Sequence, residues 1–285
     1  MKSPKKSGAP AVEVPWENPL IPNKRLRELY TAMAELRLLE EHIATIQRRA
    51  KPSSRLQVNP GEEACRVSAA LSLLTDDVTS DPAPGIATRF LRGGKLAGIL
   101  QSAELDVDAT QPVSTELPFA IDPERRLLLA IGAALALASK KKGQLVLANI
   151  YPGELTLPEW KPIFRLASAH SAPILFVALP AFGNSPKPGK LAELSTSASV
   201  PGIPVDAVDA VALYRVVQES MVRVRAGGGP VLMECVPFQL AGQDPQSSDP
   251  VLAMRASLVH RQIADDAWFH SIDTRFTARL KAVKL

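Results

Sequence analysis

Cysteine, aromatic residues and long hydrophobic runs are all scarce in this chain of 285 residues. Its two cysteines, Cys65 and Cys235, lie far apart in the sequence and lack Cys-x-x-Cys spacing. The pattern therefore predicts neither a zinc knuckle nor a redox pair, and we expect two buried reduced thiols. No apolar stretch reaches the roughly 20 residues that a membrane span needs, and no signal-peptide core follows the basic start of the chain. We expect a cytoplasmic protein that makes no contact with a membrane.

An excess of one charge sign is also lacking, since the formal net charge is only +4 at pH 7. The basic residues are spread along the chain, and aromatic residues, which serve as stacking platforms for bases, make up 5% of it. Both features argue against a nucleic-acid partner. The four histidines stand apart from cysteines and carboxylates at ligand spacing, so we assign no metal ligand among them.

Hydrophobic residues make up 46% of the chain, which is enough to bury the core of one large α/β domain. Residues 1–22 contain proline, glycine and lysine, and we expect them to form a disordered tail. A single domain is expected over 23–285. We divide it into a helical N-terminal part (23–101), a sheet core (123–240) and C-terminal helices (250–285).

Breaker residues divide the helical N-terminal part. We expect one long amphipathic helix over 23–50, a second helix over 60–74 and a Gly-interrupted helix over 87–101. Residues 80–85 are predicted to form a loop. Residues 102–122 show no convincing period and are predicted to form a long loop.

Apolar runs alternate with helical segments in the second half of the chain. Four short runs have the composition of buried strands: 145–150, 174–179, 203–207 and 231–236. Three segments have helical periodicity: 123–142, 158–170 and 209–226. Asp209 is placed to cap the last helix and Gly227 to end it, whereas the breaker-rich stretch 180–201 is predicted to be irregular. The alternation predicts an α/β fold, with a doubly wound, mostly parallel sheet and helices on both faces.

Five motifs together resemble one known family. They are Leu29-Tyr-x-x-Met33, Gly61-Glu-Glu-Ala64, Ala130-Ile-Gly-Ala-Ala-Leu-Ala136, Gly202-Ile-Pro-Val-Asp206 and the run from Arg223 to Glu234. Many α/β proteins share one such piece, but the ordered set is similar to the α subunits of thiamine diphosphate-dependent 2-oxo acid dehydrogenases. The resemblance implies a thiamin diphosphate-binding fold and oxidoreductase activity on 2-oxo acids with lipoamide disulfide as acceptor. It also implies thiamine diphosphate and magnesium as cofactors and a β subunit as partner, with a homo-oligomer as the alternative.

The resemblance also indicates where the cofactor site should lie. In the family, a Gly-Asp-Gly after the first core strand gives a magnesium ligand, and an Asn pair after the next strand gives a second. The register of the second strand places Tyr151-Pro152-Gly153 at the first motif and Pro180 at the Asn pair. The aspartate position is therefore Pro152, and proline has no side-chain oxygen to offer.

Further positions differ from the family pattern. The segment 81–84 replaces a Tyr-Arg pair that contacts diphosphate, and Phe238-Gln239 and Gly242-Gln243 replace later Tyr-Arg and Gly-His elements. Glutamine forms hydrogen bonds but does not shuttle a proton near neutral pH. We therefore name no catalytic residue and no metal ligand.

Two residues are predicted to belong to a cofactor site, Gly153 and Glu154. Glu154 is the one carboxylate left near the predicted crevice, although we interpret it as a solvated loop residue. The further members of this degenerate site are Tyr151, Pro152, Pro180 and Gln243.

Three functions remain open at this point, and whether the chain is itself an enzyme depends on the choice. The first is a non-catalytic subunit or paralogue that has lost its own cofactor site. The second is an active α subunit with a remodelled cofactor loop, and the third is a small-molecule-binding protein that uses the old crevice. We favour the first, because several separate positions lack the ligand or charge that the family chemistry uses.

Overall fold

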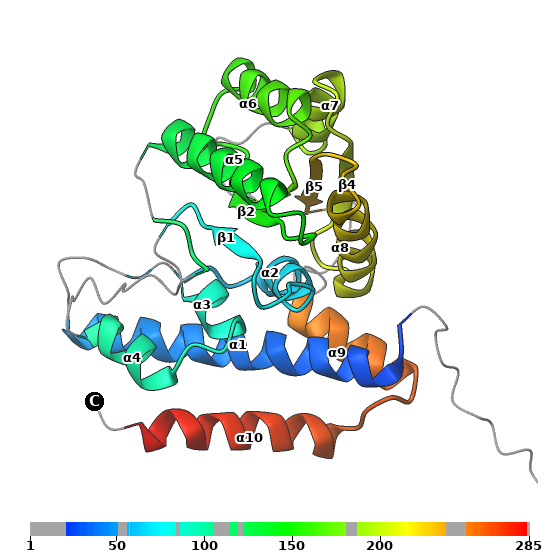
Figure 1. Cartoon of the computed structure of the whole chain (residues 1–285). Helices are drawn as coiled ribbons and strands as arrows, with labels where there is room; N and C mark the ends of the chain where they lie inside the picture. Colours follow the sequence, from blue (N-terminus) through cyan, green and yellow to red (C-terminus); the bar gives the residue numbers. More distant parts are fainter. Residues whose placement is uncertain are drawn as a thin grey trace, which may run out of the picture.

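A computed structural model describes residues 21–50, 56, 58–83, 86–104, 115–118, 122–180, 187–237 and 249–283 (Figure 1). The strands are β1 (Val78–Ser80), β2 (Val146–Ile150), β3 (Ile174–Ala178), β4 (Gly202–Asp206) and β5 (Val231–Val236). The first helices are α1 (Asn23–Ala50), α2 (Glu63–Ala70), α3 (Ala87–Leu91), α4 (Leu96–Glu104) and α5 (Pro123–Ser139). The later helices are α6 (Leu157–Ala169), α7 (Lys190–Ser197), α8 (Ala210–Arg225), α9 (Pro250–His260) and α10 (Asp266–Ala282).

The five described strands form one sheet in the order β1-β2-β3-β5-β4. Every neighbouring pair is parallel. The strands β2, β3 and β5 are buried along their whole length, as expected for strands covered on both faces. The predicted α/β fold with a parallel sheet and helices on both faces is confirmed.

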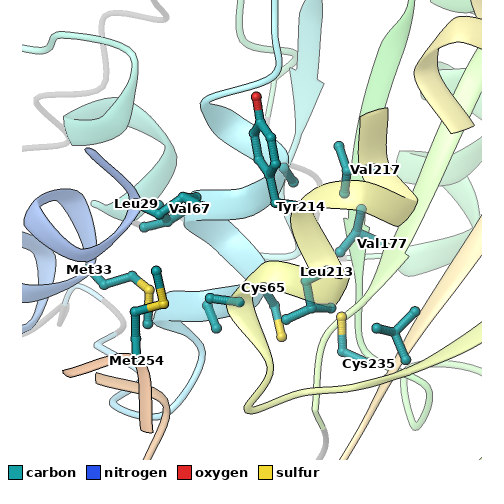
Figure 2. Close-up of a cluster of buried hydrophobic side chains, with 14 of the residues drawn as sticks. Leu29, Met33, Cys65, Val67, Val177, Leu213, Tyr214, Val217, Cys235 and Met254 are labelled. Atoms are coloured by element: carbon teal, nitrogen blue, oxygen red, sulfur yellow. The ribbon is translucent and has the colours of Figure 1, made fainter. Parts of the chain in front are cut away.

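Alternate residues of each strand point to different helical layers. Ile174 and Phe176 of β3 pack with α5, α6 and α7, where Phe176 meets the edge of the Phe164 ring. Leu175 and Val177 face the opposite layer, formed by α1, α2, α8 and α9 (Figure 2). This period of two along β3 is what a strand in the middle of a sandwich of helices requires.

The C-terminal helices complete the layer on the α1 side. The long helix α1 lies alongside α10, with α9 beside α2 (Figure 1). Tyr30 of α1 meets Phe269 of α10 edge to ring at 4.7 Å between centroids. Within the described part of the chain, no helix is long and apolar enough to cross a membrane.

The structure contains two elements that the sequence interpretation missed. Strand β1 has only three residues and includes Ser80, which we had assigned to a loop. Helix α7 lies inside the stretch predicted to be irregular. Its start is stabilised from a distant strand, because the carboxylate of Glu234 in β5 accepts hydrogen bonds from the backbone N–H groups of Gly189 and Ala192. No local pattern reveals such a cap.

Several predicted boundaries move. Helix α2 is shorter than predicted, and Gly93, with φ of 85°, separates α3 from α4. Ile21 is buried in the core although it belongs to the predicted tail, whose residues 1–20 lie outside the described part. In the predicted long loop, Glu116 forms a parallel bridge with Thr79, and residues 105–114 and 119–121 are also outside the described part.

Both cysteines are free and buried, which confirms the prediction of reduced thiols. The fold nevertheless brings Cys65 of α2 and Cys235 of β5 together, which their sequence separation did not suggest (Figure 2). Burial is the main cause that raises the pKa of the Cys65 thiol. A thiol held neutral in this way packs as a small apolar side chain.

Asp77 links four elements at the start of the sheet. It is fully buried, and its carboxylate accepts hydrogen bonds from the N–H groups of Leu74 (2.7 Å) and Leu145 (3.0 Å). The guanidinium of Arg225, at the end of α8, donates to both carboxylate oxygens at 2.8 and 2.5 Å. The single carboxylate therefore ties the end of α2 and the starts of β1 and β2 to α8.

Replacing Asp77 with alanine is expected to lower the free energy of unfolding by about 3 kcal/mol, because the change leaves a largely buried guanidinium and two N–H groups without their acceptor. Chemical denaturation measures the loss. The neighbouring Asp76 is exposed, so Asp76→Ala is the matched control and should change stability by less than about 0.5 kcal/mol. Equal effects of the two variants would contradict the anchoring role of Asp77.

Candidate functional site

The predicted crevice lies where β1 and β2 end. Asp81 follows β1 and Tyr151 follows β2, and the two strands are parallel neighbours. The side-chain amide of Asn149 donates to Asp81 Oδ1 at 2.8 Å and joins the two strand ends. The structure therefore brings residues 81–83 and 151–154 together at one edge of the sheet.

Arg66 of α2 is the centre of the polar network in this crevice. Its guanidinium donates to Glu62 Oε2 at 2.7 Å and to Asp81 Oδ1 at 3.2 Å. A third contact reaches the hydroxyl oxygen of Tyr151 at 3.3 Å. The Arg66 side chain is 7% exposed, so both ion pairs are shielded from water. One cation thus holds the α2 carboxylate and the carboxylate after β1 in place.

Tyr151 closes the network on the β2 side. Its hydroxyl accepts from the Asn59 side-chain amide at 2.6 Å and donates to Glu62 Oε2 at 3.3 Å. Burial raises the pKa of Tyr151, so the phenol keeps the proton that it donates. Burial also raises the pKa of Glu62, although the adjacent Arg66 charge opposes this shift.

Glu40 of α1 lies behind this network. It is 3% exposed, and its carboxyl group accepts a hydrogen bond from the backbone N–H of Asn59. The other oxygen, Oε2, has no hydrogen-bond partner within the described residues. Burial, followed by the charge of Glu63, raises the pKa of Glu40 to about 8. At neutral pH the side chain is therefore a neutral carboxylic acid beside charged neighbours.

A separate ion pair joins α5 to the loop after β2. Arg126 of α5, 1% exposed, donates to Glu154 Oε2 at 2.5 Å and to the Asn149 carbonyl at 3.0 Å. The backbone N–H of Tyr151 donates to the other oxygen of Glu154 at 3.2 Å. Burial raises the pKa of Glu154, and Arg126 opposes the shift. Our interpretation of Glu154 as a solvated loop residue was wrong, because a buried arginine from α5 pairs with it.

The other predicted site residues differ in burial and in their contacts. Pro152 is buried, and its carbonyl accepts the indole N–H of Trp160 at 3.1 Å. Gly153 is exposed, and Pro180 is buried two residues after β3. Ala181, which follows Pro180, and residues 238–243, which include Gln243, lie outside the described part of the chain.

The described residues do not fit a magnesium diphosphate site. Magnesium needs an octahedral shell of oxygen ligands, and its anionic ligands must be free to approach it. Here Asp81 and Glu62 pair with Arg66, and Glu154 pairs with Arg126. The described ranges contain no group of three His, Cys, Asp or Glu residues that could hold a metal. The buried Asn149 Oδ1 is an acceptor without a partner among the described residues, and a lone neutral acceptor does not replace the missing carboxylate.

Sequence reasoning missed the residues that organise this site. Two signals were available in the sequence. Glu62 and Arg66 have the i, i+4 spacing of a helical ion pair. Arg126 directly precedes thirteen uncharged residues of α5. A charged residue at the start of such an apolar helix is a candidate for a buried ion pair. Neither signal identifies the distant partner, since Asp81 and Glu154 are reached only through the fold.

Comparisons with known proteins agree with the fold and place the chain among relatives. The family model described as "Dehydrogenase E1 component" matches residues 30–267. The chain is 25% identical over 311 residues to 3-methyl-2-oxobutanoate dehydrogenase subunit alpha of Mycobacterium tuberculosis, covering 97% of this chain and 81% of that protein. It is 27% identical over 176 residues to pyruvate dehydrogenase E1 component subunit alpha of Staphylococcus aureus, covering 53% of this chain and 48% of that protein.

Glu40 is expected to make folding stability depend on pH. Its pKa is about 8 in the folded chain against an ordinary value of 4.5, so the folded state keeps a proton that the unfolded state has released. The stabilisation is complete below the unfolded pKa and is lost as pH rises through about 8. Between pH 5 and pH 8 the wild-type protein should therefore lose about 2–4 kcal/mol more unfolding free energy than the Glu40→Gln variant. Chemical denaturation of both proteins across this pH range measures the difference.

The matched control for this experiment is the adjacent Glu41, which is exposed. Glu41→Gln should leave the wild-type decline unchanged. If Glu40→Gln gave the same pH profile as the wild-type protein, the neutral form of Glu40 would be ruled out.

Proposed function

Because the chain belongs to the dehydrogenase E1 component family, we propose that it is an α-type subunit that has lost its own thiamine diphosphate and magnesium site. The family acts on 2-oxo acids with thiamine diphosphate and magnesium. In this proposal the chain retains the fold and the association surfaces and contributes no catalytic group. It acts as a non-catalytic subunit or paralogue beside a β subunit.

One observation carries the proposal. At the ends of β1 and β2 the described charged residues pair with one another: Arg66 pairs with Glu62 and Asp81, and Arg126 pairs with Glu154. A diphosphate would need those arginines, and a cation would need those carboxylates. Breaking a buried ion pair costs about 3–5 kcal/mol, so a ligand must overcome that cost before it gains any affinity.

The position of the family aspartate supports the same conclusion. Pro152 stands there, and the hydrogen bond from Trp160 to its carbonyl fixes the backbone of the loop. Restoring a carboxylate at this point adds a ligand without disturbing that carbonyl. The loop can therefore be tested by substitution.

Calorimetric titration with thiamine diphosphate and magnesium tests the loss of the site. The wild-type chain should show no metal-dependent binding at micromolar concentration. The double variant Pro152→Asp with Pro180→Asn should raise affinity at least tenfold, which corresponds to about 1.4 kcal/mol. The control is Pro158→Asp, because Pro158 is an exposed proline in the first turn of α6. Clear metal-dependent binding by the wild-type chain would contradict the proposal.

Association with a β subunit tests the remaining part of the proposal. Mixed with the β subunit of a 2-oxo acid dehydrogenase encoded by the same organism, the chain should elute as a heteromeric complex whose mass light scattering measures. Because the complex requires no cofactor in this proposal, thiamine diphosphate should not change the elution. A chain that stays unassociated at micromolar concentration would count against a role in such an assembly.

A further inference from the structure

Positive charge collects at the edge of the sheet where the strands begin. The strands β1, β2, β3 and β5 are parallel, so the segments that precede them lie at one edge. Three consecutive exposed lysines, at 140–142, precede β2. Arg223 and Arg225 belong to the last turn of α8, which leads into β5. We call this surface the basic edge, and its cations are Arg92, Lys140, Lys141, Lys142, Arg223 and Arg225.

Hydrogen bonds hold the segments of the basic edge together. Arg225 donates to the Gly143 carbonyl at 2.8 Å as well as to the buried Asp77. Arg92, at the end of α3, donates to the carbonyl oxygens of Thr75 at 3.0 Å and Asp77 at 3.1 Å. The cations therefore share one surface although they come from the ends of α3, α5 and α8.

Few carboxylates oppose this charge. Asp77 is buried and paired with Arg225, and Glu219, the last acid of α8, pairs with Arg215. Asp76 is the exposed acid that is left at the edge. The three lysines form no ion pair with a described residue. A helix C-terminus favours cations, yet consecutive lysines beside two arginines also repel one another, and the described residues supply little acid to relieve that repulsion.

Two exposed apolar side chains lie beside the basic edge, Leu74 (59% exposed) and Val222 (68%). Two contacts join α8 to the loop after α2: Gln218 donates to Ser72 Oγ at 2.6 Å, and Arg225 pairs with the buried carboxylate of that loop. Val222 lies between Gln218 and Arg225 on one stripe of α8, and Leu74 lies between the loop residues of the two contacts. Both apolar side chains therefore lie at the seam between α8 and this loop.

We propose that the basic edge, together with Leu74 and Val222, docks an acidic, leucine-containing segment of a partner protein. Carboxylates of the segment pair with the exposed lysines, and an aliphatic side chain covers the two residues at the seam. A polynucleotide fits less well, because the exposed apolar side chains here are aliphatic and offer no ring on which a base can stack. The basic edge lies at the opposite end of the strands from the Arg66 network, so the outcome of a cofactor titration does not affect it.

Fluorescence anisotropy with two labelled probes tests this surface: a peptide of Glu-Glu-Leu repeats and a polyglutamate of equal length. The full chain should bind the leucine-containing peptide at low ionic strength, with an affinity that falls as salt is added. Lys140→Glu combined with Lys142→Glu should weaken this binding at least about tenfold. The matched control is Arg48→Glu with Arg49→Glu, because both arginines are exposed in the last turn of α1. The control reverses the same amount of charge at another helix end and should change the affinity by less than about twofold.

Two further variants separate docking from stability. Lys141 has a φ of 53°, in the left-handed region that favours glycine. Lys141→Gly should therefore raise the midpoint of thermal unfolding while it weakens peptide binding. Val222→Ser should weaken binding of the leucine-containing peptide and leave binding of polyglutamate unchanged, because only the first probe covers the apolar side chain.

Any of four results would contradict the docking of such a segment. The first is a wild-type chain that does not bind the leucine-containing peptide at low ionic strength. The second is an equal loss of affinity in the two double variants, and the third is equal binding of the two peptides by the wild-type chain. The fourth is a labelled oligothymidylate that binds more tightly than the peptide and loses affinity with Lys140→Glu and Lys142→Glu, which would assign the edge to a polynucleotide.

Discussion

The buried guanidinium of Arg66 is the interaction on which the crevice of this protein depends. It pairs with Glu62 and Asp81 and contacts Tyr151, so one side chain of α2 joins the ends of β1 and β2. Two carboxylates at this depth would be unstable without a cation. In this chain the cation comes from the protein itself.

The residues that hold the fold together differ from the residues that determine what this edge of the sheet can bind. The fold is held by Asp77 with its partner Arg225 and by Glu234 at the start of α7, and Arg225 and Glu234 belong to a motif that resembles the family. The charged residues at the strand ends are paired by Arg66 and Arg126. A chain can therefore keep the first set, and with it the architecture and the assembly surfaces, while the second set changes what the crevice can bind.

Local patterns predicted the architecture well because parallel strands and amphipathic helices have their own periodicity. The motif around Gly202 and the apolar run before Val236 identified strands that the structure confirms. The patterns failed where a distant residue decides the local structure. Helix α7 depends on a carboxylate from β5, and β1 is too short to show alternation. Glu154 was interpreted as solvated because its partner, Arg126, is 28 residues away in the sequence.

A crystal structure grown with magnesium and thiamine diphosphate tests most directly whether the internal ion pairs at the ends of β1 and β2 exclude the cofactor. We predict that the Arg66 pairs with Glu62 and Asp81, and the Arg126 pair with Glu154, remain intact. We also predict that no diphosphate or metal density lies between Asp81 and Gly153. Density for a bound diphosphate at this edge of the sheet, with either arginine turned toward it and its carboxylate released, would contradict the account.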